Sequence, residues 1–126
     1  MIILTVEEII TLHEKLVAAT GGSDGLRDIG LLESAVMNCY QTFGEQELYL
    51  GVTEKAARLA FGICSNHPFI DGNKRAAVTA MLVILRLNSI DVSYSQPELA
   101  ALGLGIADGS LDYEAVVDWI HTHLSD

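Results

Sequence analysis

The densest group of chemically active side chains in this chain lies in ten residues, from Asn66 to Arg75. Histidine titrates closer to neutral pH than any other side chain, so His67 is a candidate general base. Asp71 offers a hard carboxylate oxygen of the kind that binds Mg²⁺ carried by phosphate groups. Lys74 and its neighbour Arg75 offer cations that bind phosphate oxygens. These residue types in one short stretch predict a site for a phosphate-bearing ligand with Mg²⁺.

The same stretch is predicted to be a helix end, a tight loop and a new helix start. Pro68 disfavours helical geometry at the residue before it, so the preceding helix should stop near Asn66. Gly72 permits a sharp turn, and Asn73 is a good N-cap for the next helix. The two cations then lie at the positive end of a helix dipole, which is unfavourable. An anion bound to the open backbone N–H groups of that first turn would compensate for their placement.

Each piece of this stretch has a plainer explanation when it is taken alone. A His-Pro pair commonly marks a helix end, Asp-Gly-Asn is commonly a turn, and a Lys-Arg pair is commonly solvated surface. Their occurrence together favours a functional loop. Phe69, in the middle, is expected to plug the core and so pin the loop between its two helices.

The nine residues His-Pro-Phe-Ile-Asp-Gly-Asn-Lys-Arg at 67–75 resemble the signature of the Fic/Doc superfamily. Their Asn-Lys-Arg ending is similar to the Doc (death-on-curing) branch. Doc-type toxins are also similar to this chain at 12–14, 21–22, 25–28, 31–35 and 85–88, in the expected order. The resemblance covers nearly the whole chain. It implies an all-α fold: a single-domain helical bundle over residues 1–126, with a buried central helix after the catalytic loop.

The resemblance also implies an enzyme that moves part of a nucleoside triphosphate onto a protein hydroxyl. The Doc branch moves the γ-phosphate, with elongation factor Tu as the target. We therefore expect a protein kinase toxin of a type II toxin–antitoxin system that inhibits translation. Its co-substrate would be ATP or another nucleoside triphosphate, and its metal would be Mg²⁺.

Site roles follow from the same resemblance, position by position. His67 would deprotonate the acceptor hydroxyl, Asp71 would hold Mg²⁺, and Phe69 would anchor the motif in the core. The phosphate-binding residues would be Gly72, Asn73, Lys74 and Arg75. The last two are also expected to act in catalysis, by stabilising charge on the transferred group.

Two departures from AMP-transferring relatives favour phosphate transfer. Lys74 stands where those enzymes usually have glycine, and Val78 stands where they have a second arginine. Transfer of AMP, and a non-catalytic binding module with the same fold, remain alternatives. Self-inhibited relatives carry a Glu followed by Gly or Asn, which this chain lacks. Inhibition would then come from a Phd-like antitoxin whose helical tail covers an apolar groove.

Composition limits the other classes of function. Seventeen acidic and seven basic residues give a net charge of −10, which disfavours direct binding to nucleic acid. Cys39 and Cys64 have no zinc-ligand spacing and are too few for a secreted disulfide framework, so reduced thiols in the cytoplasm are expected. The most apolar run, residues 76–85, is too short to span a membrane, and the N-terminus lacks the basic region of a signal peptide.

The remaining expectations concern the elements around the loop. Helices are predicted at 6–18, 31–40, 54–66, 74–87, 96–107 and 111–123, with caps at Thr5, Thr53, Ser95 and Ser110. Residues 90–94 alternate in polarity and could be extended. Residues 43–51 are either a flap for a protein substrate or an ordinary connection.

Four side chains outside the loop are predicted to have mainly structural roles. His13 is predicted to be a half-buried packing residue, with a place near the site as the alternative. Arg27 and Asp28 are predicted to form a local ion pair rather than to reach the site. Glu33 is predicted to be a solvated or capping carboxylate rather than a second catalytic acid.

Overall fold

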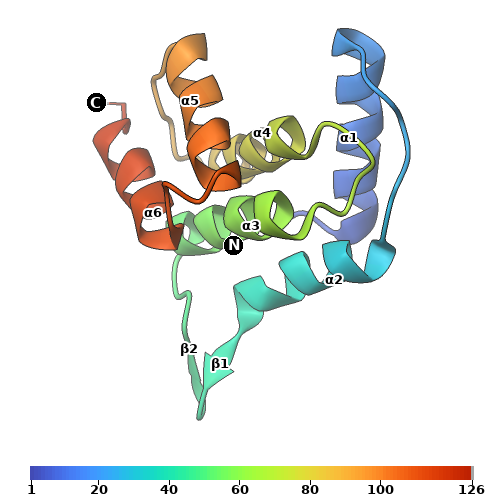
Figure 1. The fold of residues 1–126 in the computed structure, drawn as a ribbon. Helices are drawn as coiled ribbons and strands as arrows, with labels where there is room; N and C mark the ends of the chain where they lie inside the picture. The colour runs from blue at the N-terminus through green and yellow to red at the C-terminus, as the bar shows by residue number, and fades with distance from the viewer. Residues whose placement is uncertain (126) are drawn as a thin grey trace.

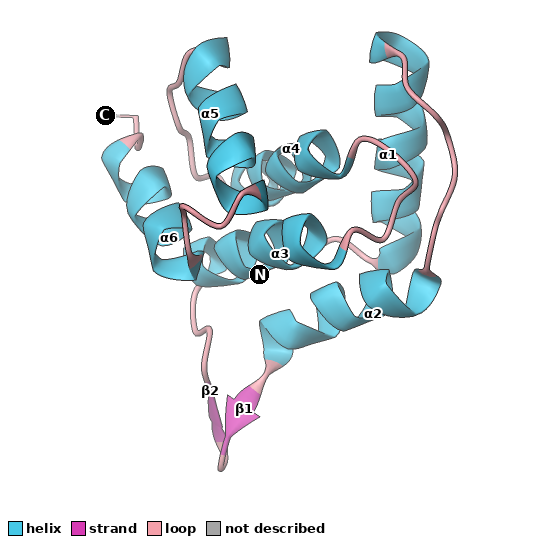
Figure 2. Cartoon of the chain, viewed as in Figure 1, coloured by secondary structure: helices cyan, strands magenta, loops and turns pink. Residues whose placement is uncertain are grey.

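The computed structural model describes residues 1–125, apart from the side chain of Phe43. Its helices and strands follow one another as α1 (Val6–Thr20), α2 (Ile29–Met37), a 3₁₀ turn (Asn38–Tyr40), β1 (Thr42–Phe43), β2 (Gln46–Glu47), α3 (Val52–Asn66), α4 (Asn73–Leu87), α5 (Gln96–Ala107) and α6 (Tyr113–Thr122). The only sheet in this part of the chain is one small hairpin (Figure 2), so the all-α prediction is confirmed.

Helices α3 and α4 form the centre of the bundle. They lie side by side, with α1 and α2 toward one end and α5 and α6 toward the other (Figure 1). Small side chains on α3 let the neighbouring helices approach closely. They are Ala56, Ala57 and Ala60, and all three are fully buried. The prediction of a buried central helix after the loop is confirmed: α4 is buried along most of its length by residues that include Ala76, Ala80, Met81, Ile84 and Leu85.

Helix caps were predicted correctly where a Thr or Ser is followed three residues later by Glu. Thr5 and Ser95 each form a capping box with the glutamate three residues later. The predicted cap at Thr53 is wrong, because the chain already turns into α3 at Gly51, whose backbone is extended. The cap predicted at Ser110 is also wrong. Asp112 caps α6 by accepting the Ala115 N–H, while the Ser110 hydroxyl bonds Gly105 O in the preceding turn.

The connection between α2 and α3 is a short antiparallel hairpin that projects from the body of the protein (Figure 1). Its base is held by Lys55, a buried lysine on α3. The Lys55 ammonium donates to the carbonyl of Cys39 at 3.1 Å, to Glu47 Oε1 at 3.1 Å and to the carbonyl of Tyr49. These bonds satisfy the buried charge and fix both ends of the hairpin to the core.

The cysteines and the C-terminal segment have structural roles. Cys39 and Cys64 are both free and buried, and burial raises the pKa of each thiol to about 11. Val92, in the segment predicted to be extended, pairs with Leu124. His123 lies 2.8 Å from Glu98, and this hydrogen bond lowers the Glu98 pKa to about 2.

Within residues 1–125, no helix has both the length and the apolar character that crossing a membrane requires.

Candidate active site

Helix α3 ends where the sequence predicted, at Asn66, and delivers His67 to the loop. His67 is the C-cap and adopts a left-handed backbone, with φ 51° and ψ 56°. Its N–H donates to Ile63 O at 3.1 Å, and Pro68 prevents another helical turn. The side chain is exposed, so the imidazole is accessible to a substrate.

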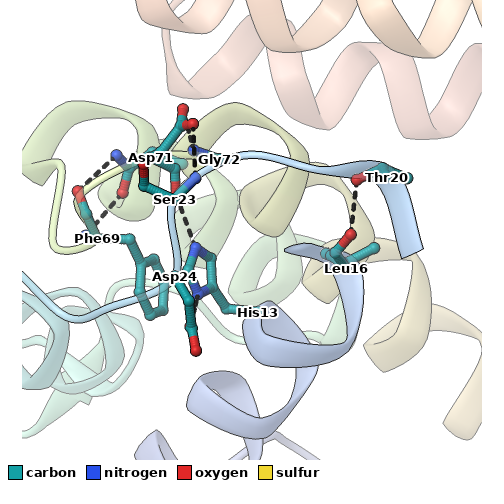
Figure 3. Close-up of polar contacts among 9 residues, drawn as sticks. His13, Leu16, Thr20, Ser23, Asp24, Phe69, Asp71 and Gly72 are labelled. Atoms are coloured by element: carbon teal, nitrogen blue, oxygen red, sulfur yellow. Dashed lines mark hydrogen bonds and ion pairs between the residues drawn. The ribbon is translucent and has the colours of Figure 1, made fainter. Parts of the chain in front are cut away.

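Phe69 and His13 form the floor of the loop. Phe69 is 1% exposed, and its ring stacks on the His13 imidazole with centroids 3.9 Å apart. His13 Nε2 lies 2.7 Å from the Asp71 carbonyl oxygen (Figure 3). Because that oxygen only accepts, Nε2 carries the proton. His13 is therefore more deeply buried than predicted, and it acts both as a packing residue and as a support of the loop.

Asn73 is not the N-cap that the sequence suggested. Gly72 takes that position in a left-handed conformation with φ 77°, which starts α4 one residue earlier than predicted. Asn73 is then directed back into the loop, where its Oδ1 accepts from Phe69 N–H at 2.9 Å and its Nδ2 donates to Phe69 O at 3.0 Å. The side-chain amide is buried and closes the loop through both of these bonds, so the backbone N–H is the group that Asn73 can offer to a phosphate.

Replacing Asn73 with alanine is expected to destabilise the protein by roughly 2–4 kcal/mol, because two buried backbone groups of Phe69 lose their partners. Chemical denaturation of both proteins measures this difference. Asn38→Ala is the matched control, since Asn38 is only half-buried at the end of α2. Equal free energies of unfolding for the Asn73 variant and the wild type would show that the amide does not hold the loop.

Asp71 is the candidate metal ligand, and two backbone donors set its charge state. Its Oδ2 accepts from Ser23 N–H at 3.2 Å and its Oδ1 from Gly72 N–H at 2.8 Å (Figure 3). The hydrogen bond from Ser23 lowers the Asp71 pKa most, and the bond from Gly72 lowers it further, so the carboxylate is ionised at neutral pH. Gly22 lies beside it with φ 108°, a conformation that favours glycine, and an added Cβ there would lie 2.9 Å from Oδ2.

The donor set around Asp71 fits a Mg²⁺ ion that arrives with a nucleotide. Mg²⁺ commonly takes one or two carboxylates and fills its remaining positions with phosphate oxygens and water. Asp71 offers one exposed, ionised carboxylate of this kind. No cluster of three potential ligands among His, Cys, Asp and Glu occurs in the described part of the chain.

The first turn of α4 presents the cations. Lys74 and Arg75 are both exposed, and no side chain in the described structure caps this turn. Arg75 Nη1 donates to the hydroxyl of Thr20 at the end of α1. The stem of Lys74 lies against α5, where an added Cβ at Gly103 would be 3.5 Å from Lys74 Cβ. The turn therefore combines uncapped N–H groups with two positive side chains, the arrangement that binds anions.

Sequence reasoning missed that residues 22–28, the bracing segment, run beside the loop and support it. Leu26 pairs with Phe69, and Ile70 N–H donates to Gly25 O at 3.1 Å. Glycine is favoured at position 25 because its φ of 129° is rarely adopted by other residues, and an added Cβ would also lie 2.8 Å from the end of the Ile70 side chain. The four glycines at 21, 22, 25 and 30 were the available signal, since close backbone approach is one reason for glycine.

The ion pair predicted between Arg27 and Asp28 is wrong. Arg27 instead donates to the carbonyl oxygens of Asn66 and His67, and Asp28 caps α2 by accepting the Leu31 N–H. Both side chains bind helix ends instead, because helix ends leave backbone groups unpaired. Glu33 is exposed on α2, which agrees with the solvated role predicted for it.

Comparison with known proteins identifies relatives of this arrangement. A model of the Fic/DOC family matches residues 3–85, which include the whole loop and most of α4. The "Protein kinase doc" of Escherichia phage P1 is 32% identical over 112 residues, which is 89% of this chain and 87% of that protein. The "Toxin Doc" of Mycolicibacterium smegmatis is 36% identical over 75 residues, which is 60% of this chain and 58% of that protein.

Proposed function

The chain belongs to the Fic/DOC family, and from this premise we propose that it is a Doc-type toxin that phosphorylates a hydroxyl group of a protein. One observation carries the proposal. An exposed histidine, an ionised aspartate and the uncapped, doubly cationic first turn of α4 follow one another within nine residues of a rigidly held loop. Similarity to a protein named as a kinase supports phosphate transfer over the other chemistry of the family.

The first turn of α4 binds the phosphates of the nucleotide. Its backbone N–H groups point at the ligand, and Lys74 and Arg75 neutralise charge on the phosphate oxygens. Asp71 is the residue that would hold Mg²⁺. That ion, when bound, would neutralise negative charge on the phosphate oxygens during transfer.

His67 is the general base in this scheme. Its imidazole takes the proton of the acceptor hydroxyl as the hydroxyl oxygen attacks the γ-phosphorus. The new oxygen–phosphorus bond forms while the bond from the γ-phosphorus to the β–γ bridging oxygen breaks, and the nucleoside diphosphate leaves with that electron pair. Arg75 and Lys74 stabilise the charge that spreads over the transferred oxygens. ATP is the proposed nucleotide.

The proposed partners are a protein substrate and an antitoxin. We propose an elongation factor Tu-like translation factor as substrate, with its acceptor hydroxyl reaching the exposed His67. A shallow groove between α1 and α4, lined in part by Leu4, Leu12 and Val83, would receive the helical tail of a Phd-like antitoxin.

The direct test is transfer of label from two forms of ATP. The protein is incubated with elongation factor Tu, Mg²⁺ and ATP labelled at either the α- or the γ-phosphate. We expect label on protein only from the γ-position, because phosphate transfer leaves the α-phosphate in ADP. Label from the α-position would instead establish AMP transfer. No label from either position, with several candidate acceptor proteins, would contradict the proposed reaction.

A further inference from the structure

The left-handed conformation of His67 needs support from outside α3. Non-glycine residues rarely adopt this conformation and keep it only where the surroundings determine it. The last carbonyl groups of α3 also lack intrahelical partners, and the last turn of this helix contains no basic residue to balance the negative end of its dipole. A cation from another segment would meet both needs.

Arg27 meets both needs from the bracing segment. Its Nε donates to His67 O at 2.7 Å, and its Nη2 donates to Asn66 O at 2.9 Å. The backbone N–H groups of Arg27 and Asp28 donate to Pro68 O at 2.7 and 3.0 Å. Four hydrogen bonds from two consecutive residues therefore fix the carbonyl groups of 66, 67 and 68 in space.

We propose that Arg27 is a positioning residue for His67, which holds the left-handed backbone and thereby aims the imidazole at the acceptor hydroxyl. The fork of the guanidinium spans two consecutive carbonyls, which an ammonium group cannot do in the same fixed geometry. The backbone dihedral angles of His67 set the direction of its side chain, so any relaxation of this residue moves the imidazole. The catalytic part of this proposal rests on the proposed function, whereas the conformational part does not.

The conformational part is tested by NMR without any activity assay. Backbone chemical shifts of residues 66–68 are measured in the wild type and in Arg27→Met. Arg86→Met is the matched control, because Arg86 is 84% exposed on α4 and forms only a 3.7 Å surface ion pair with Asp91. We expect His67 to lose its positive-φ shifts in Arg27→Met and to keep them in Arg86→Met. Unchanged His67 shifts in Arg27→Met would overturn the proposal.

The catalytic part is tested by kinetics in two backgrounds. With His67 present, Arg27→Met should lower kcat by about 10- to 100-fold, with little change in the KM for ATP, because misplacing a catalytic group costs rate rather than nucleotide binding. Arg27→Lys should recover only part of this loss. In a His67→Ala background, Arg27→Met should lower the residual rate no further, because the imidazole that Arg27 positions is already absent.

The other outcomes are equally decisive. An equal fall in kcat with and without the His67 imidazole would show that Arg27 acts elsewhere and would overturn the positioning role. A lower melting temperature as the only effect would assign Arg27 to helix capping alone, and would also overturn it. If the wild type transfers no phosphate, the proposed function fails, while the NMR comparison still decides whether Arg27 holds His67.

Discussion

Replacing His67 with alanine is expected to lower kcat for phosphate transfer by about 10²- to 10⁴-fold, the usual contribution of a general base. The free energy of unfolding should change little, because the side chain is exposed. Affinity for ATP should also be retained, since the groups proposed to bind phosphate lie on α4. The measurement is the initial rate of γ-label transfer at saturating ATP and acceptor protein.

His121→Ala is the control for this substitution, because His121 is an exposed histidine on α6, outside the loop. It should transfer phosphate at the wild-type rate. A His67→Ala variant with full activity would remove the general base from the mechanism. It would favour the reading of this chain as a binding module that keeps the fold without the chemistry.

Phe69→Ala is the substitution with the largest expected effect on stability, a loss of about 3–5 kcal/mol. Phe69 is 1% exposed, it stacks on His13, and both of its backbone polar groups are bonded by Asn73. Removing the ring leaves a cavity under the loop and takes away the stacking partner of the His13 imidazole. Most domains are stable by only about 5–15 kcal/mol, so denaturant unfolding should show a large shift of the midpoint.

Phe61→Ala is the matched control, because Phe61 is only half-buried on α3, with its ring beside Arg58. It should cost clearly less stability and leave the loop intact. Phe69→Leu keeps most of the buried volume and extends the test to a variant that folds readily, with an expected loss of about 1–2 kcal/mol and reduced phosphate transfer. Equal costs for the two alanine variants would show that Phe69 does not anchor the motif.

Local rules were sufficient for much of the fold. The capping boxes at Thr5 and Ser95, the end of α3 before Pro68 and the apolar character of α4 each depend on residues close together in sequence. The position of Phe69 in the core could also be predicted, because a large aromatic side chain in a loop otherwise rich in polar groups favours burial.

Long-range contacts decided what the sequence could not show. Arg27 and Asp28 are neighbours of opposite charge, but their partners lie 40 residues away and at the start of the next helix. An exposed ion pair contributes little free energy, whereas a side chain that satisfies unpaired backbone groups at a helix end contributes more. The position of Asn73 after Gly72 predicts an N-cap. Gly72 instead adopts a positive φ and is the N-cap itself, so Asn73 lies inside the helix and its amide bonds Phe69.

The central claim is that the first turn of α4 grips the phosphates of ATP beside His67. A crystal structure of the protein with Mg²⁺ and a non-hydrolysable ATP analogue tests it most directly. We expect the phosphates within hydrogen-bonding distance of the backbone N–H groups of 73–75, the metal on Asp71 and the γ-phosphorus facing His67. Nucleotide density at another site, with this turn empty, would contradict the account.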